Sequence, residues 1–170
     1  MIEALFLVLA ASGAQAADPL APARQGKIQC INPNAEKKTC MGFASYTVRA
    51  DGTYDATATI MIAPAPAIAM ETRSTGKVEG DQVCAVVRRE DYTAATFTVD
   101  GKPADAATSE AIKGQILAAV ASMEGKNACS RDKAEGNVML AEMTLDGAAR
   151  PDLNQRYIWV SPTDGYKLGM

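Results

Sequence analysis

Apolar and polar residues alternate most clearly in residues 53–62 (TYDATATIMI), where every second side chain from Tyr54 onward is apolar. Successive side chains of a β-strand point to opposite faces, so this spacing predicts a strand with one buried face. Residues 42–49 form another β-rich run, and Ala50-Asp51-Gly52 joins the two. An Asp-Gly step between two such runs predicts a hairpin, so we expect an antiparallel strand pair here.

A longer apolar periodicity predicts a helix over residues 106–123. Ile112, Ile116 and Val120 recur at intervals of four, which places them on one face of a helix. A second, shorter helix is predicted over residues 82–90, because Val83, Val86 and Val87 have the spacing i, i+3, i+4. Further strands are predicted at residues 26–31, 67–78, 94–99, 137–145 and 155–160.

This order of elements predicts an α+β domain. We expect an antiparallel sheet of about 5–7 strands, with one long and one short helix packed on one face, and two disulfides. Residues 25–170 would form this single domain. Residues 17–24 (ADPLAPAR) are rich in Pro and Ala and are expected to be a loose N-terminal arm.

Residues 1–16 (MIEALFLVLAASGAQA) are typical of a cleaved signal peptide. Residues 4–11 are apolar without interruption, and Ala14-Gln15-Ala16 matches the small-x-small pattern that precedes cleavage. The first residues lack the usual Lys or Arg, and a buried N-terminal strand or helix is the alternative. Export predicts a periplasmic or secreted protein, and no later segment is apolar enough to be expected to span a membrane.

The four cysteines predict two disulfides, because an exported chain folds in an oxidising compartment. Three pairings are possible. Cys30 and Cys40 bracket a short polar segment with turn residues and are expected to pair, which leaves Cys84 to pair with Cys129. The spacings differ from those of four-thiolate metal sites and of C-x-x-C redox sites.

Composition narrows the chemistry that is expected. The chain has a formal net charge of -3 with no basic run, which argues against a nucleic-acid partner. It contains no histidine, the usual general base and a common metal ligand. No catalytic, cofactor-binding or metal-ligating residue is therefore assigned. Tyr157 and Trp159 lie two residues apart on the last predicted strand and are the candidate binding face.

The sequence thus favours an exported, non-enzymatic domain: a binding, assembly or inhibitor-like module. Its expected partner is an envelope protein or a small ligand, without a cofactor. The alternatives are a small hydrolase that uses carboxylates or Lys, and a metal or redox carrier. A hydrolase would require titratable side chains with perturbed pKa values gathered in one pocket.

Overall fold

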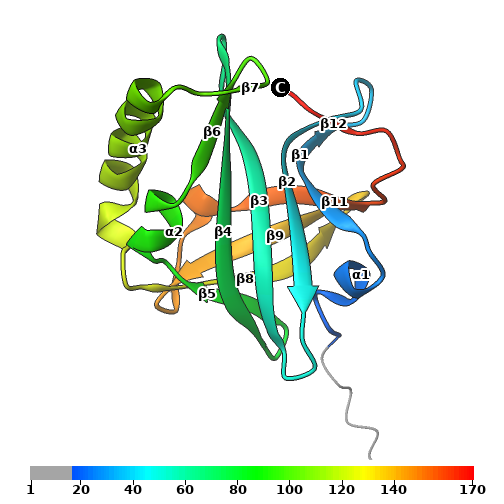
Figure 1. Ribbon diagram of the computed structural model, residues 1–170. Helices are drawn as coiled ribbons and strands as arrows, with labels where there is room; N and C mark the ends of the chain where they lie inside the picture. The colour runs from blue at the N-terminus through cyan, green and yellow to red at the C-terminus, as the bar shows by residue number, and fades with distance from the viewer. Residues whose placement is uncertain (1–16) are drawn as a thin grey trace, which may run out of the picture.

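The computed structural model describes residues 17–170, which form a single large antiparallel sheet with few helices (Figure 1). The sheet has 12 strands and includes 52% of the described residues, whereas helices include 19%. The prediction of an α+β domain with 5–7 strands is therefore wrong. The expected export signal, residues 1–16, lies outside the described residues.

The strands are β1 (Ile28–Asn34), β2 (Thr39–Val48), β3 (Thr53–Pro64), β4 (Ala67–Glu79), β5 (Gln82–Val86), β6 (Thr96–Val99), β7 (Lys102–Pro103), β8 (Asn127–Glu135), β9 (Val138–Leu145), β10 (Ala148–Ala149), β11 (Gln155–Val160) and β12 (Lys167–Leu168). The helices are α1 (Ala21–Arg24), α2 (Arg89–Thr93) and α3 (Ala106–Val120), and the 3-10 turns are η1 (Ala121–Met123) and η2 (Pro151–Leu153).

The sheet closes on itself. In spatial order the ring is β1, β2, β3, β4, β5, β8, β9 and β11, and β11 pairs again with β1. Each neighbouring pair in the ring is antiparallel. Because strand side chains alternate between two faces, every strand of the ring sends half of its side chains into a shared interior.

The N-terminal segment covers one end of this interior, at the lower right in Figure 1. Leu20 is fully buried and packs with Tyr54, Val83 and Trp159 among others. Arg24 of α1 pairs with Asp18 and donates a hydrogen bond of 3.3 Å to a backbone carbonyl near the end of β2. Residues 17–24 are therefore anchored by an apolar contact and an ion pair, and not loose as expected.

Residues 82–90 do not form the expected helix. They form β5 and the start of α2, and residues 127–135, for which no strand was predicted, form β8. Valine is β-branched and favours strands, and pairing with β8 decides the conformation here. Cys84 and Cys129 are direct cross-strand partners in this pairing, with Cα atoms 4.1 Å apart, and form a disulfide.

The second disulfide, Cys30–Cys40, joins the two strands of the β1–β2 hairpin, with Cα atoms 5.3 Å apart. Both cysteines are fully buried and cluster with Val160 and Tyr166, near the place where β12 pairs with β2. The disulfides therefore connect neighbouring strands at two separate places in the ring.

An insertion of α2, β6, β7 and α3 lies between β5 and β8 in the sequence. The long helix occupies the predicted range, and Asp105 caps it by accepting a hydrogen bond of 2.7 Å from the Thr108 amide. β6 pairs with the first part of β4, and Phe97 of β6 packs with Met70 and with Ile112 and Ile116 of α3. No helix within residues 17–170 is long and apolar enough to cross a membrane.

Candidate ligand-binding site

The interior of the closed sheet contains a cavity of about 220 Å³. Seven of the ring strands contribute to it, because the inward positions alternate along each strand. The lining residues are Gln29, Tyr46, Tyr54, Val83, Ala85, Ala128, Ser130, Asp132, Ala141, Met143 and Gln155. The cavity is thus lined by residues that are distant in sequence, and only closure of the sheet brings them together.

Small side chains leave room for this cavity. Ala141 on β9 is the register partner of both Asp132 on β8 and Gln155 on β11, and all three line the space. Ala85 and Ala128 are likewise register partners that line it. An engineered apolar cavity of roughly 150 Å³ holds benzene, so the space here suits a molecule of about one ring with a substituent.

Asp132 is the one charged residue among the residues that line this cavity. The Tyr157 hydroxyl donates a hydrogen bond of 2.6 Å to its Oδ2 atom. Burial raises the pKa of the Asp132 carboxyl, although the hydrogen bond from Tyr157 acts in the opposite direction. Burial, together with this contact, also raises the pKa of Tyr157. The cavity wall therefore carries a carboxyl group that is held by the protonated phenol of Tyr157.

Aromatic rings form the adjoining part of the interior. Tyr46 packs edge to face with Tyr54 and with Trp159, at centroid distances of 5.5 and 6.3 Å. The Tyr46 hydroxyl donates to Gln29 Oε1 at 2.9 Å. Burial raises the pKa of Tyr46 and raises the pKa of Tyr54 to about 12. These phenols are protonated at neutral pH, so they serve as hydrogen-bond donors and not as bases.

Tyr157 and Trp159, the residues of the predicted binding face, lie on the same face of β11 and point toward the interior. Tyr157 is 2% exposed, and its ring contacts Trp159 edge to face at 5.7 Å. Both line a second hollow of about 420 Å³ beside α1, which Asp132 also lines. Asp132 thus lines both the cavity and this hollow, and its partner Tyr157 lines the hollow.

The sequence pattern did not point to Asp132, Ser130, Gln29 or Tyr46 as site residues. Ser130 and Asp132 occupy alternate positions of β8, which is a strand-like spacing. This spacing did not predict a strand, because the inward-facing residues of a strand are normally apolar and these two are polar. The available signal was the alternation itself across Ala128, Ser130 and Asp132.

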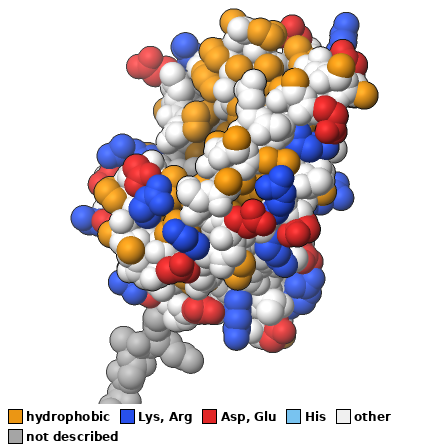
Figure 2. Space-filling model, turned by 90° about the vertical axis from the view of Figure 1, so that its left-hand side faces the viewer, with side chains coloured by type: hydrophobic (Ala, Val, Ile, Leu, Met, Phe, Trp, Pro, Cys, Tyr) orange, Lys and Arg blue, Asp and Glu red, His pale blue; other side chains and the backbone are white. Residues whose placement is uncertain are grey.

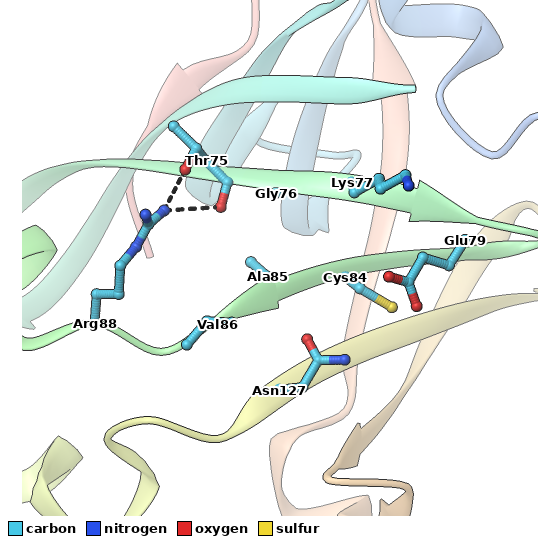
Figure 3. A pocket seen from close by; sticks show the side chains of 9 residues that line it. All are labelled: Thr75, Gly76, Lys77, Glu79, Cys84, Ala85, Val86, Arg88 and Asn127. Carbon is cyan, nitrogen blue, oxygen red and sulfur yellow. Dashed lines mark hydrogen bonds between the residues drawn. The ribbon is translucent and has the colours of Figure 1, made fainter. Parts of the chain in front are cut away.

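The ring wall is incomplete between β4 and β5. Their pairing begins at Glu79↔Gln82 and ends at Lys77↔Cys84, and beyond this point β4 pairs on that side with β6 instead. An outer groove of about 240 Å³ follows this divergence (Figure 3). Arg88 crosses it and donates hydrogen bonds to the backbone oxygen and hydroxyl of Thr75. The guanidinium group therefore links two segments that strand pairing does not join.

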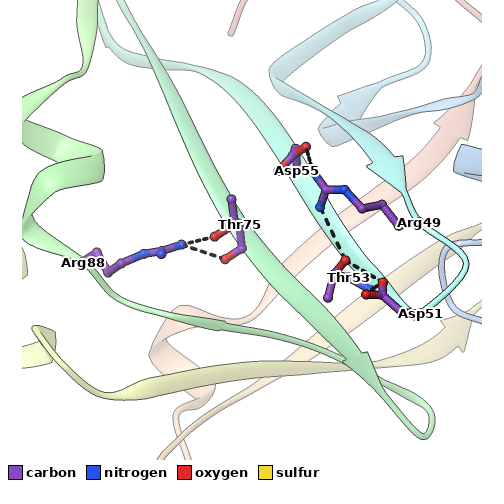
Figure 4. Close-up of polar contacts among 6 residues, drawn as sticks. All are labelled: Arg49, Asp51, Thr53, Asp55, Thr75 and Arg88. Atoms are coloured by element: carbon purple, nitrogen blue, oxygen red, sulfur yellow. Dashed lines mark hydrogen bonds and ion pairs between the residues drawn. The ribbon is translucent and has the colours of Figure 1, made fainter.

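Polar contacts at the neighbouring β2–β3 turn stabilise the hairpin (Figure 4). Asp51 Oδ1 accepts hydrogen bonds from the Thr53 amide and hydroxyl at 2.9 and 2.6 Å, and these bonds lower the pKa of Asp51. Arg49 pairs with Asp55 on the outer face. Each group has a partner within the hairpin, so this cluster has a structural role.

The outer surface differs in character from the interior. On the side of α2 and α3, charged side chains cover the middle and lower parts, and hydrophobic ones gather toward the top (Figure 2). Within residues 17–170, no three His, Cys, Asp or Glu side chains are grouped so that they could hold a metal ion.

The fold and site define a class of protein: a closed antiparallel sheet, linked by two disulfides, around a small polar and aromatic cavity. No family model, no curated protein and no solved structure matches the chain. The site itself is therefore the basis for a functional proposal.

Proposed function

We propose that the protein is an exported, non-enzymatic binding protein that holds a small ligand inside its closed sheet. The observation that carries this proposal is the cavity of about 220 Å³ lined by Tyr46, Tyr54 and Asp132. Binding sites for small molecules typically combine apolar and aromatic walls with a few polar groups that fix orientation. This cavity has that composition.

Two features support export. Residues 1–16 have the pattern of a cleaved signal peptide, and the two disulfides are typical of proteins that fold in oxidising compartments. A disulfide-linked closed sheet also suits a binding role, because rigid walls reduce the entropy lost when a ligand binds.

A cavity-filling variant tests the proposal. Native mass spectrometry of protein exported from a bacterial host, purified without reductant or chelator, would detect a retained small molecule. Ala141→Leu would occupy the cavity from β9, whereas Ala118→Leu adds the same atoms to an exposed position on α3 and is the matched control. Thermal-shift screening of both variants with a small-molecule collection provides a second readout.

We expect bound mass or ligand-induced stabilisation in the wild type and in Ala118→Leu, and loss of both in Ala141→Leu. Circular dichroism and the thiol count would show that Ala141→Leu retains the fold, and Ala128→Leu serves if it does not. Equal binding by the cavity-filled and control variants would place the ligand elsewhere. No binding to any of the proteins would overturn the proposal.

A second candidate function is hydrolysis assisted by the Asp132 carboxyl. The observation that favours it is the gathering of Asp132, Tyr46 and Tyr54 in one cavity, all with raised pKa values. A carboxyl with a raised pKa can act as a general acid or base. Turnover of ester, amide or glycoside probes by the wild type, abolished in Asp132→Asn, would favour this function over simple binding.

A further inference from the structure

The cations nearest to Asp132 in sequence are directed away from it. Arg131 and Lys133 flank it on β8 and therefore point to the outer face of the sheet. There Arg131 pairs with Asp81 at 2.9 Å and Lys133 with Glu142 at 3.9 Å. Among residues 17–170, Asp132 forms no ion pair of its own, and its side chain accepts a hydrogen bond from the neutral Tyr157 hydroxyl.

An inward carboxylate without a cation is costly, because burial removes water that would otherwise solvate the charge. A single hydrogen bond from Tyr157 compensates for only part of this loss. A positively charged ligand group in the cavity would supply the missing partner. The absence of Lys and Arg from the cavity lining also disfavours anions there.

The aromatic walls favour the same kind of ligand. Tyr46 and Tyr54 both line the cavity, and the face of an aromatic ring attracts a cation within about 6 Å of its centre. Ser130, Gln29 and Gln155 add oxygen atoms that can accept hydrogen bonds from an ammonium group. A carboxylate, two aromatic rings and acceptor oxygens thus line one small space.

We infer that the cavity binds a small organic cation, an amine the size of about one substituted ring, whose ammonium group pairs with the Asp132 carboxylate. This inference rests on the proposed binding function and specifies its ligand class. Tyr157 then acts as a positioning residue, since its hydroxyl fixes one carboxylate oxygen at 2.6 Å while the other faces the ligand.

Three probes of similar size and different charge test the inference at neutral pH: benzylamine, benzyl alcohol and benzoate. Binding would be followed by calorimetry and by NMR of the tyrosine ring resonances. The informative variant is Asp132→Asn, which keeps the side-chain shape and removes the charge. Asp55→Asn is the matched control, because Asp55 lies on the outer face and pairs with Arg49.

We expect wild type and Asp55→Asn to bind benzylamine about ten- to hundredfold more tightly than benzyl alcohol, since hydrogen bonds to charged groups are the stronger ones. Asp132→Asn should lose this preference. If Asp132→Asn does not fold, the order of the wild type's affinities for the three probes still tests the cation assignment. Equal binding of benzylamine and benzyl alcohol, or a preference that survives in Asp132→Asn, would overturn the cation assignment.

The failure of this inference is distinct from failure of the proposed function. If benzyl alcohol binds as tightly as benzylamine and this binding is lost in Ala141→Leu, the cavity remains a binding site. Only the assignment of a cationic ligand is then rejected. The same conclusion holds if none of the three probes binds but the native protein retains a bound mass that is lost in Ala141→Leu. If neither the probes nor a native bound mass is found, the binding function is overturned as well.

Discussion

The Tyr54 hydroxyl lies directly against the backbone of Gly76 and donates a hydrogen bond of 2.9 Å to the carbonyl oxygen of Cys84. This contact lies where β4 and β5 begin to diverge, so a side chain closes the wall at the point where strand pairing ends. Gly76 is required here because a Cβ atom would overlap both the Tyr54 hydroxyl and the Cys84 carbonyl.

Gly76→Ala is therefore expected to destabilise the protein by about 1–3 kcal/mol, the usual cost of overpacking a filled space. Urea unfolding followed by circular dichroism would measure it. Gly114→Ala is the control: a Cβ there meets no atom within 4 Å, and replacing a helical glycine should stabilise by about 0.5–1 kcal/mol. Equal effects of the two substitutions would contradict the close contact at Gly76.

Leu20→Ala should destabilise the protein by about 2–5 kcal/mol, because truncating this fully buried side chain leaves a cavity between the N-terminal segment and the ring. Trp159 packs in the same cluster, so its fluorescence should report the loss directly. Val86→Ala, at a position that is 45% exposed, should change the free energy of unfolding by less than about 0.5 kcal/mol. A small effect at Leu20 would mean that residues 17–24 do not anchor the end of the sheet.

The two disulfides should contribute unequally to stability. Cys84–Cys129 spans 45 residues and Cys30–Cys40 spans 10, and the chain-entropy relation then predicts about 4 and about 3 kcal/mol. Replacing each pair by alanine and measuring urea unfolding would compare them. A larger loss from the shorter loop would show that native packing under Tyr166, and not loop closure, dominates.

The buried tyrosines predict a loss of stability at alkaline pH. Burial raises the pKa of Tyr54 from its ordinary value near 10 to about 12, so the folded state retains the proton more strongly than the unfolded state. The resulting stabilisation is present below pH 10 and is lost as the pH rises toward 12. Absorbance titration of tyrosinate, with Tyr54→Phe for comparison, should show delayed ionisation that ends with unfolding. Ionisation of Tyr54 near its ordinary pKa in the folded protein would contradict this.

In the ligand-free protein, Asp132 should also make folding stability fall as the pH rises, but in the acidic range. Its folded pKa is raised, so its favourable contribution is present below the ordinary aspartate pKa and is lost as the pH rises through the folded value. Asp132→Asn should therefore be increasingly more stable than the wild type as the pH rises from acid to neutral. Asp105 has the opposite shift, because hydrogen bonds from Thr108 lower its pKa. Asp105→Asn should lose stability, relative to the wild type, as the pH rises.

Local signals predicted much of the secondary structure. Alternation in residues 53–62 and the Asp51-Gly52 turn predicted the β2–β3 hairpin, and apolar spacing predicted the range of α3. These elements depend on neighbours within a few residues, which is why a single sequence reveals them. Residues 82–86 were mistaken for helix because Val83, Val86 and Val87 have helical spacing. Valine itself favours strands, and pairing with the distant β8 decided the conformation.

The sequence by itself determined the strand-rich hairpins, the long helix and a cysteine spacing that indicated the two disulfides. Closure of the ring, the burial of Leu20 and the cavity around Asp132 were decided only by tertiary structure. The physical reason is that β11 pairs with β1 across more than a hundred residues, and no local pattern encodes that contact. The polar inward residues of β8 have the composition of a loop, and only closure of the ring places them in an interior.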